Sequence, residues 1–166
     1  FNAYNLLAAL AVLLTGDTAL DDACNLLSTA QPAPGRMQCL GGGDSPLVVI
    51  DYSHTPDSLR SALQALRPVT TNTLWCVFGC GGDRDIGKRS EMGAIADRDA
   101  DRVVVTDDNP RSEHSASIIE DIVDGIERRE GLHIEADRDR AIAFAIGASE
   151  PGDVVLIAGK GHENYQ

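Results

Sequence analysis

Basic residues are scarce in this sequence, and no long apolar run is present. Lysine and arginine together number 14 against 26 aspartates and glutamates, so the 166 residues carry a formal net charge of −12 at pH 7. A broad phosphate-binding surface needs clustered lysine and arginine, which argues against a nucleic-acid-binding protein. No apolar stretch approaches the ~20 residues that a membrane-spanning helix requires. We therefore expect a cytoplasmic protein that neither binds nucleic acid nor inserts into a membrane.

Cysteine is too sparse and too irregularly spaced to form a disulfide framework. The four cysteines are Cys24, Cys39, Cys76 and Cys80. Cys76 and Cys80 lie close together, but no second pair accompanies them, so the spacing does not favour a zinc site. We expect reduced thiols that behave as small apolar side chains, and we expect no metal ion to be held by these residues.

Lysine occurs only as Lys88 and Lys160, and both lie in glycine-rich stretches. A random scatter of lysines over a surface would rarely place both in such stretches. We interpret the coincidence as a local site for an anion or a carboxylate, without assigning a separate role to either lysine.

Beyond residue 46, apolar β-branched runs alternate with helical patterns. The apolar runs span 47–50, 74–78, 102–105 and 154–158, with a weaker one near 133–134. The helical patterns span 56–66, 88–98, 113–129 and 138–148. Continuously apolar strands that alternate with helices are typical of a parallel sheet covered on both faces. The sequence therefore predicts a doubly wound α/β domain with a mostly parallel sheet.

The first 46 residues have a different character. Residues 3–14 are strong helix formers that are apolar on nearly every side, which predicts a buried helix, and residues 21–28 predict a second short helix. Proline and glycine are dense at 31–36 and 41–46, which indicates a domain boundary. The sequence opens on Phe1 and Asn2 rather than on Met, so we expect the amino-terminal part of a larger protein to be missing from it.

Unusual polar residues follow the ends of four of the predicted strands. They are DYSH at 51–54, GCGGDRDIGKR at 79–89, DDNPR at 107–111 and GKGHE at 159–163. The ends of parallel strands share one edge of a sheet, where open α/β sheets bind ligands. We therefore expect these four loops to converge on one crevice.

Two of these loops contain arginine, one together with several glycines and the other together with two aspartates. The loop 79–89 permits close backbone approach to a ligand; a tight strand-to-helix turn would explain its glycines but not Arg84, Lys88 and Arg89. It lacks the last glycine of a dinucleotide fingerprint, which counts against an oxidoreductase. In the loop 107–111 the fork of Arg111 suits a carboxylate, and the acids and amide suit an ammonium group. Alone, that loop could merely turn the chain.

The other two loops leave more than one interpretation. Glu163 suits an amine, whereas His162 is either a general base or a hydrogen-bonded structural group. His54 has the same two interpretations. Asp51, at the end of the first apolar run, is either a ligand of ribose hydroxyls or a helix cap.

Together the segments FNAYNLLAA, PAPGRM, VVIDYSHTPDSL, WCVFGCGGDRDIGKR, VVVTDDNPRSE and AGKGHENYQ resemble the Mur ligase family over essentially the whole chain. The DNPR motif is similar to that of its diaminopimelate-adding members, because lysine-adding members generally lack the arginine. The resemblance implies that residues 1–36 end a central ATPase domain and that residues 37–166 form a Rossmann-like acceptor-binding domain. It also implies a role in building peptidoglycan, and we expect a monomer.

The resemblance further implies two sets of site residues. The set for meso-diaminopimelate comprises Arg84, Asp108, Asn109, Pro110, Arg111, Gly159 and Glu163. The set near the nucleotide comprises Asn2, Asn5, Arg36 and Asp51. The implied reaction joins diaminopimelate to a UDP-N-acetylmuramoyl dipeptide through an acyl phosphate made from ATP.

The family's phosphate-binding loop, its magnesium ligands and its carbamylated lysine have no counterpart in these residues. We therefore expect ATP and Mg²⁺ to act only in the full-length enzyme and this chain to be inactive alone. A ligase for lysine or for a folate acceptor, and an amino-acid-binding module without catalysis, remain alternatives.

Overall fold

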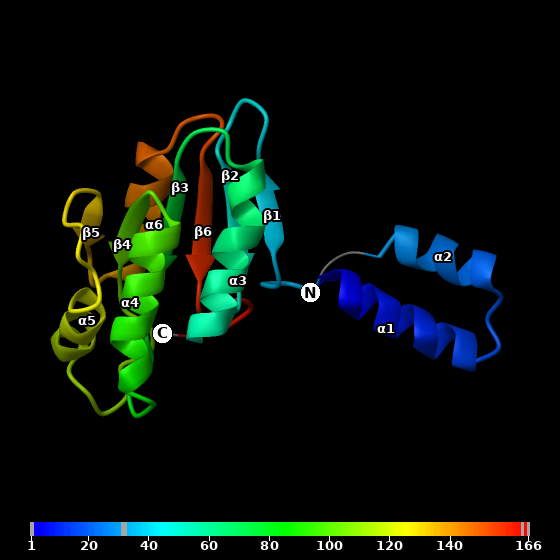
Figure 1. Cartoon of the computed structure of the whole chain (residues 1–166), viewed down its shortest axis with the longest axis horizontal. Coiled ribbons are helices and arrows are strands. Elements are labelled where there is room, and N and C mark those ends of the chain that lie inside the picture. The colour runs from blue at the N-terminus through cyan, green and yellow to red at the C-terminus, as the bar shows by residue number, and fades with distance from the viewer. Residues whose placement is uncertain (1, 31–32, 164, 166) are drawn as a thin grey trace. The chain divides into compact units, whose positions relative to one another are not determined.

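The computed structural model describes residues 2–30, 33–163 and 165, with side chains from residue 4 onward. The chain forms two compact units, Phe1–Pro32 and Ala33–Gln166 (Figure 1). The assignment of the residues up to 36 to a central ATPase domain stays a prediction. Within the described ranges, no helix is both long enough and apolar enough to cross a membrane.

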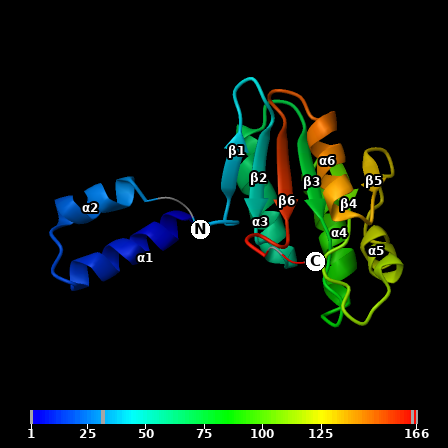
Figure 2. The same ribbon diagram turned by 180° about the vertical axis from the view of Figure 1, so that it is seen from behind.

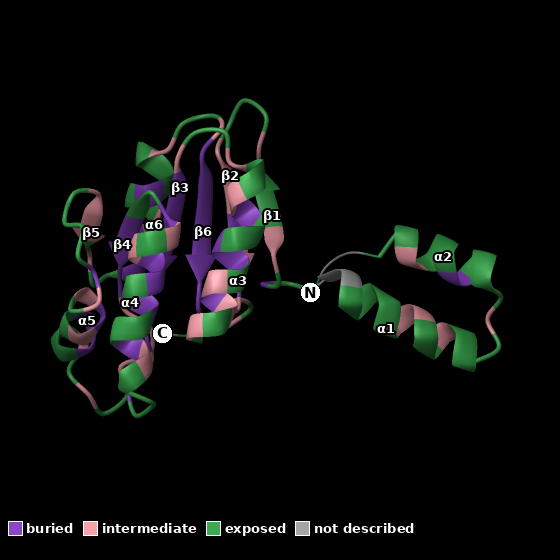
Figure 3. Ribbon diagram, in the orientation of Figure 1, coloured by how far each residue is buried: buried purple, intermediate pink, exposed green. Residues whose placement is uncertain are grey.

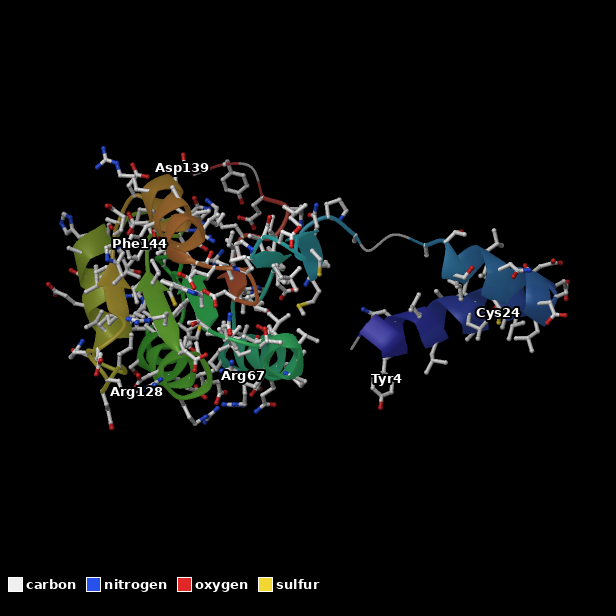
Figure 4. The ribbon with its side chains drawn as sticks, turned by 90° about the horizontal axis from the view of Figure 1, so that it is seen from above. Tyr4, Cys24, Arg67, Arg128, Asp139 and Phe144 are labelled. Carbon is white, nitrogen blue, oxygen red and sulfur yellow. The ribbon has the colours of Figure 1, made fainter. Side chains whose placement is uncertain are left out.

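The first unit is a pair of helices, α1 (Asn2–Thr15) and α2 (Leu20–Ser28), as predicted. The expected burial of α1 is wrong within this unit. Tyr4 and Val12 are 78% and 69% exposed, and Tyr4 projects away from its helix (Figures 3 and 4). One short neighbouring helix cannot cover a helix that is apolar on nearly every side, so most of that surface stays outside the contact.

The second unit contains a six-stranded sheet in the order β1-β2-β6-β3-β4-β5. The strands are β1 (Gln38–Gly41), β2 (Leu47–Asp51), β3 (Leu74–Phe78), β4 (Arg102–Val105), β5 (Leu132–Ile134) and β6 (Val154–Ala158). Only β1 is antiparallel to its neighbour, β2; the four other pairings are parallel. The predicted mostly parallel α/β sheet is therefore confirmed.

Helices cover both faces of this sheet (Figure 2). They are α3 (Pro56–Leu66), the 3-10 turn η1 (Arg67–Val69), α4 (Gly87–Asp99), α5 (Ser115–Val123) and α6 (Arg138–Ala148). Alternate side chains of β3 enter the two cores: Cys76 packs with residues of α3, α4 and α5, whereas Val77 packs with residues of α6. Such burial on both sides explains why the strands are continuously apolar.

Two elements differ from the sequence-based expectation. The strand β1 was not expected, because its residues are half-buried or exposed and lack the continuous apolar run of the other strands. The helix α5 ends at Val123 rather than at residue 129. A Cβ atom on Gly125 would lie 1.9 Å from the backbone oxygen of Ser90, so the chain packs closely on α4 there. Ile126 is still buried beyond the helix end, which is why the apolar pattern continues.

Candidate functional site

A cavity of about 820 Å³ lies at the carboxyl ends of β2, β3, β4 and β6. It is lined by Tyr52, His54, Thr55, Pro56, Asp57, Gly81, Arg84, Asp85, Lys88, Glu91, Asp108, Arg111, Gly159, Glu163 and Tyr165. All four polar loops contribute to this lining, so their predicted convergence on one crevice is confirmed. Five of the seven residues predicted for the acceptor line the cavity; Asn109 and Pro110 do not.

Arg111 adopts a left-handed backbone conformation, with φ of +54°. Its Nη1 atom donates a hydrogen bond of 2.7 Å to the backbone oxygen of Gly82. The same atom donates a longer bond of 3.4 Å to the backbone oxygen of Asn109. A guanidinium group has five N–H donors in a planar fork, so these contacts of Nη1 leave capacity for a carboxylate. The side chain is exposed to the cavity, close to the loop that carries Arg84.

The glycines of the second loop serve loop packing. A Cβ atom on Gly82 would lie 1.9 Å from the backbone oxygen of Pro110, and one on Gly79 would lie 2.1 Å from that of Thr106. The backbone nitrogen of Gly82 also donates to the oxygen of Asn109, at 2.9 Å. Only glycine permits this approach, which brings Arg84 and Arg111 to the same cavity.

Acidic groups face the same cavity from the third and fourth loops. Asp108 lines it beside Gly159, where an added Cβ atom would lie 3.2 Å from Oδ2 of Asp108 and where φ is +114°. Asn109 is partly buried and does not line the cavity, and its Oδ1 atom accepts a hydrogen bond of 3.3 Å from Nζ of Lys160. Burial lowers the pKa of Lys160, a residue that is 8% exposed.

Glu163 is oriented by a residue that the sequence analysis did not single out. The hydroxyl of Tyr52 donates a hydrogen bond of 3.1 Å to Oε1 of Glu163. This bond to a carboxylate, followed by burial, raises the pKa of Tyr52. The rings of His54 and His162 lie 4.7 and 5.6 Å from that of Tyr52, so both histidines belong to an aromatic cluster beside the cavity.

Two of the residues predicted near the nucleotide, Arg36 and Asp51, belong to the second unit but are not part of the cavity lining. Asp51 is buried, and its carboxylate accepts hydrogen bonds from the backbone nitrogen of Met37, at 2.9 Å, and from the hydroxyl of Ser53. Thr55, and not Asp51, caps α3, with Ser58 completing a capping box. The helix-cap alternative for Asp51 is therefore wrong.

Arg36 and the two asparagines complete that set. The guanidinium carbon of Arg36 lies 4.6 Å from the ring centre of Tyr52. Asn5 is exposed on α1 in the first unit, whereas the side chain of Asn2 lies outside the described residues. Their predicted role at a nucleotide stays a prediction.

Lys88 and Asp85 also line the cavity, although neither belongs to the residue set that the resemblance implies for the acceptor. Lys88 donates from Nζ to the backbone oxygen of His54, at 2.8 Å, and so joins the first loop to α4. Asp85 accepts from the backbone nitrogen of Gly87, at 2.9 Å, at the beginning of that helix. Position within the four polar loops was the available signal for both. Among the side chains that the structure describes, no cluster of three potential metal ligands occurs.

Comparison with known proteins identifies close relatives. The family described as Mur ligase, glutamate ligase domain, matches residues 35–161. The UDP-N-acetylmuramoyl-L-alanyl-D-glutamate--2,6-diaminopimelate ligase of Chromobacterium violaceum is 54% identical over 168 residues, which cover 100% of this chain and 34% of that protein. The protein of the same name from Pseudomonas aeruginosa is 55% identical over 166 residues, with the same coverage.

A solved structure shows the same likeness in three dimensions. A structure with that ligase name superposes on this chain with a TM-score of 0.76 at 43% identity, covering 99% of this chain and 34% of the other. The chain thus spans about a third of the length of these relatives. Because the family match extends over most of its length and relatives share more than half of its residues, the chain belongs to the Mur ligase family.

Proposed function

We propose that the chain is the acceptor-binding part of a ligase that adds meso-diaminopimelate to UDP-N-acetylmuramoyl-L-alanyl-D-glutamate in the cytoplasm. The observation that carries this proposal is the placement of Arg84, Arg111 and Glu163 on one cavity. The names of the relatives that share more than half of the residues support the choice of reaction.

The charges of the cavity suit a zwitterionic amino acid. Arg84 and Arg111 offer planar donor forks to a carboxylate, and Asp108 and Glu163 offer oxygens to an ammonium group. meso-Diaminopimelate carries two carboxylates and two amino groups, so it can engage both kinds of residue at once. Lysine has one carboxylate fewer and would leave one arginine fork without a partner.

In the proposed reaction, ATP phosphorylates the γ-carboxylate of the precursor's D-glutamate to give an acyl phosphate. The neutral amine of diaminopimelate attacks the acyl carbon, a tetrahedral intermediate forms, phosphate leaves, and the nitrogen loses a proton to solvent to give the amide. ATP and Mg²⁺ supply the activation and are bound mainly by parts of the full-length enzyme outside this chain. Asn2, Asn5, Arg36 and Asp51 are proposed to contact the nucleotide from this side.

The contribution of the cavity residues is to position the amine. Holding an amine beside an activated carboxyl group can accelerate its attack by several orders of magnitude, because the entropy of encounter is lost on binding. Asp108 and Glu163 accept hydrogen bonds from the ammonium group at the end of the acceptor that does not react, and the arginines fix the orientation of the acceptor. Closure of the domains would exclude water, which otherwise hydrolyses the acyl phosphate.

The test is an assay of the full-length enzyme with ATP, the UDP-muramoyl dipeptide and either meso-diaminopimelate or L-lysine. The expected product carries diaminopimelate, and Arg111→Ala raises the KM for diaminopimelate strongly with a smaller effect on the KM for ATP. Preferential ligation of lysine or of a folate, or an unchanged KM in the Arg111→Ala enzyme, would contradict the proposal. Absence of ATP turnover would favour a binding module.

A further inference from the structure

Two non-glycine residues of the cavity loops share an unusual backbone conformation. Asp83 and Arg111 have φ values of +52° and +54°, in the left-handed region that side chains other than that of glycine adopt at a cost. Such residues persist only where surrounding contacts fix them. The contacts that fix these two join their loops to each other.

The side chain of Asp83 holds the residue that follows Arg111. Its Oδ1 atom accepts a hydrogen bond of 2.5 Å from the hydroxyl of Ser112, and its Oδ2 atom accepts one of 3.2 Å from the backbone nitrogen of Ser112. In the opposite direction, the backbone nitrogen of Asp83 donates to Oε1 of Glu113, at 2.5 Å. These hydrogen bonds run in both directions between Asp83 and the two residues that follow Arg111. We call the set of Asp83, Ser112 and Glu113 the clasp.

This clasp is anchored in the packed helices. Oε1 of Glu113 also accepts a bond of 2.7 Å from Nη2 of Arg89, whose side chain is 1% exposed on α4. Nη1 of Arg89 donates to Oδ2 of Asp121 on α5, at 2.8 Å. Arg89 is buried between two helices that pack on the sheet, so it holds the carboxylate of Glu113 in place. That carboxylate in turn holds the backbone nitrogen of Asp83.

We propose that Asp83, Ser112 and Glu113 are positioning residues that hold Arg111 in the conformation that binds the acceptor's carboxylate. The inference rests on the proposed function, because it assigns the clasp to that same site. None of the three lines the cavity, so they act through Arg111 and not by touching the acceptor. The bond from Arg111 to Gly82, the neighbour of Asp83, closes the same ring of contacts.

The test compares Ser112→Ala with Ser112→Thr in the full-length enzyme. Alanine removes the hydroxyl donor to Asp83, whereas threonine keeps it. We expect Ser112→Ala to raise the KM for diaminopimelate about 3- to 10-fold and to leave kcat and the KM for ATP within about twofold. We expect threonine to restore the KM. Asp44→Asn, in the turn between β1 and β2 at the other end of the sheet, is the matched control and should change neither constant.

A second readout does not depend on the acceptor. Hydrogen exchange of peptides that cover residues 106–116 should become faster in Ser112→Ala and return to the original rate in Ser112→Thr. Unchanged exchange in Ser112→Ala would show that the clasp does not hold the loop and would overturn the inference.

Two kinetic outcomes separate the inference from the proposed function. Faster exchange with an unchanged KM in Ser112→Ala, in an enzyme where Arg111→Ala does raise it, would overturn the positioning role alone. A lower kcat together with an equal rise in the KM values for diaminopimelate and for ATP would show a merely structural role. That result would overturn the positioning role as well. An unchanged KM in Arg111→Ala would instead contradict the proposed function.

Discussion

The hydroxyl of Tyr52 donates to Oε1 of Glu163 across 111 residues of sequence, at 3.1 Å. This bond joins the loop after β2 to the loop after β6, and these two strands lie side by side and parallel in the sheet. It uses one oxygen of Glu163 and thereby sets the direction of the carboxylate at the cavity wall. The cavity thus owes the orientation of an acidic group to a residue with no charge at neutral pH.

Replacing Tyr52 by phenylalanine tests this relationship. The ring and its packing remain, but the donor to Glu163 is lost, so the carboxylate is less well oriented for an ammonium group. We expect Tyr52→Phe to raise the KM for diaminopimelate about 3- to 10-fold with little change in the KM for ATP. Steady-state kinetics of the full-length enzyme measure this. An unchanged acceptor KM would show that the bond does not matter for binding.

The clasp around Arg111 predicts a pH dependence of stability. Hydrogen bonds from the side chain and then the backbone of Ser112 lower the pKa of Asp83 below its ordinary 3.8, and the bond from Arg89 lowers the pKa of Glu113 below 4.5. A carboxylate with a lowered folded-state pKa stabilises the fold above its unfolded-state pKa, and the contribution disappears as pH falls through the lowered value.

We therefore expect the Tm of Ser112→Ala to lie below that of the unmodified chain at about pH 7, with a difference that shrinks towards about pH 2. Thermal unfolding followed by circular dichroism across this range provides the measurement. A difference that grows as the pH falls would contradict the assigned sign.

The cysteines should divide into two classes of reactivity. Burial raises the pKa of Cys80 to about 11 and that of Cys76 further, whereas Cys24 and Cys39 are exposed. The thiolate is the reactive form, so the two buried thiols should resist alkylation at about pH 8. Peptide mapping after brief treatment with iodoacetamide should find label on Cys24 and Cys39 only. Rapid labelling of Cys80 in the folded protein would contradict its burial.

Asp153 offers a test of stability that is separate from the cavity. Burial raises the pKa of its carboxyl group, but hydrogen bonds from Glu150, Thr73 and Trp75 outweigh this and lower the pKa overall. All three partners are N–H donors, at 3.0, 3.0 and 3.1 Å. In asparagine an NH2 group replaces one of the two carboxylate oxygens, so a donor would face at least one of these N–H groups.

We expect Asp153→Asn to reduce the free energy of unfolding by about 1–3 kcal/mol while the KM for diaminopimelate stays unchanged. Chemical denaturation and steady-state kinetics check the two parts. Asp153 directly precedes β6, so it lies at the end of the sheet opposite the cavity. A raised KM for diaminopimelate would show that the two ends of the sheet are coupled.

The sheet and the position of the site can be predicted from the sequence, for a physical reason. Strands buried on both faces must be apolar along their whole length, so β3 and β6 were visible as continuous runs. Parallel strands bring the loops that follow them to one edge of the sheet, so the sequence alone predicts that Arg84, Arg111 and Glu163 lie close together. The strand β1 was missed because an exposed edge strand needs no apolar pattern.

Contacts between loops could not be read from the sequence. Nothing in the order of residues shows that Tyr52 meets Glu163 or that Asp83 holds Ser112, because each pair is joined only through the register of the folded sheet. The glycines at 79 and 82 illustrate the same limit. Their pattern predicts close approach of a ligand, but in the structure the atoms that they approach belong to a neighbouring loop.

The most direct test is a crystal structure of the full-length enzyme with meso-diaminopimelate. The account predicts a carboxylate of the ligand within hydrogen-bond distance of the Arg111 guanidinium and an amino group within the same distance of Glu163. A ligand bound in another cavity, or bound here without contact to either side chain, would contradict it.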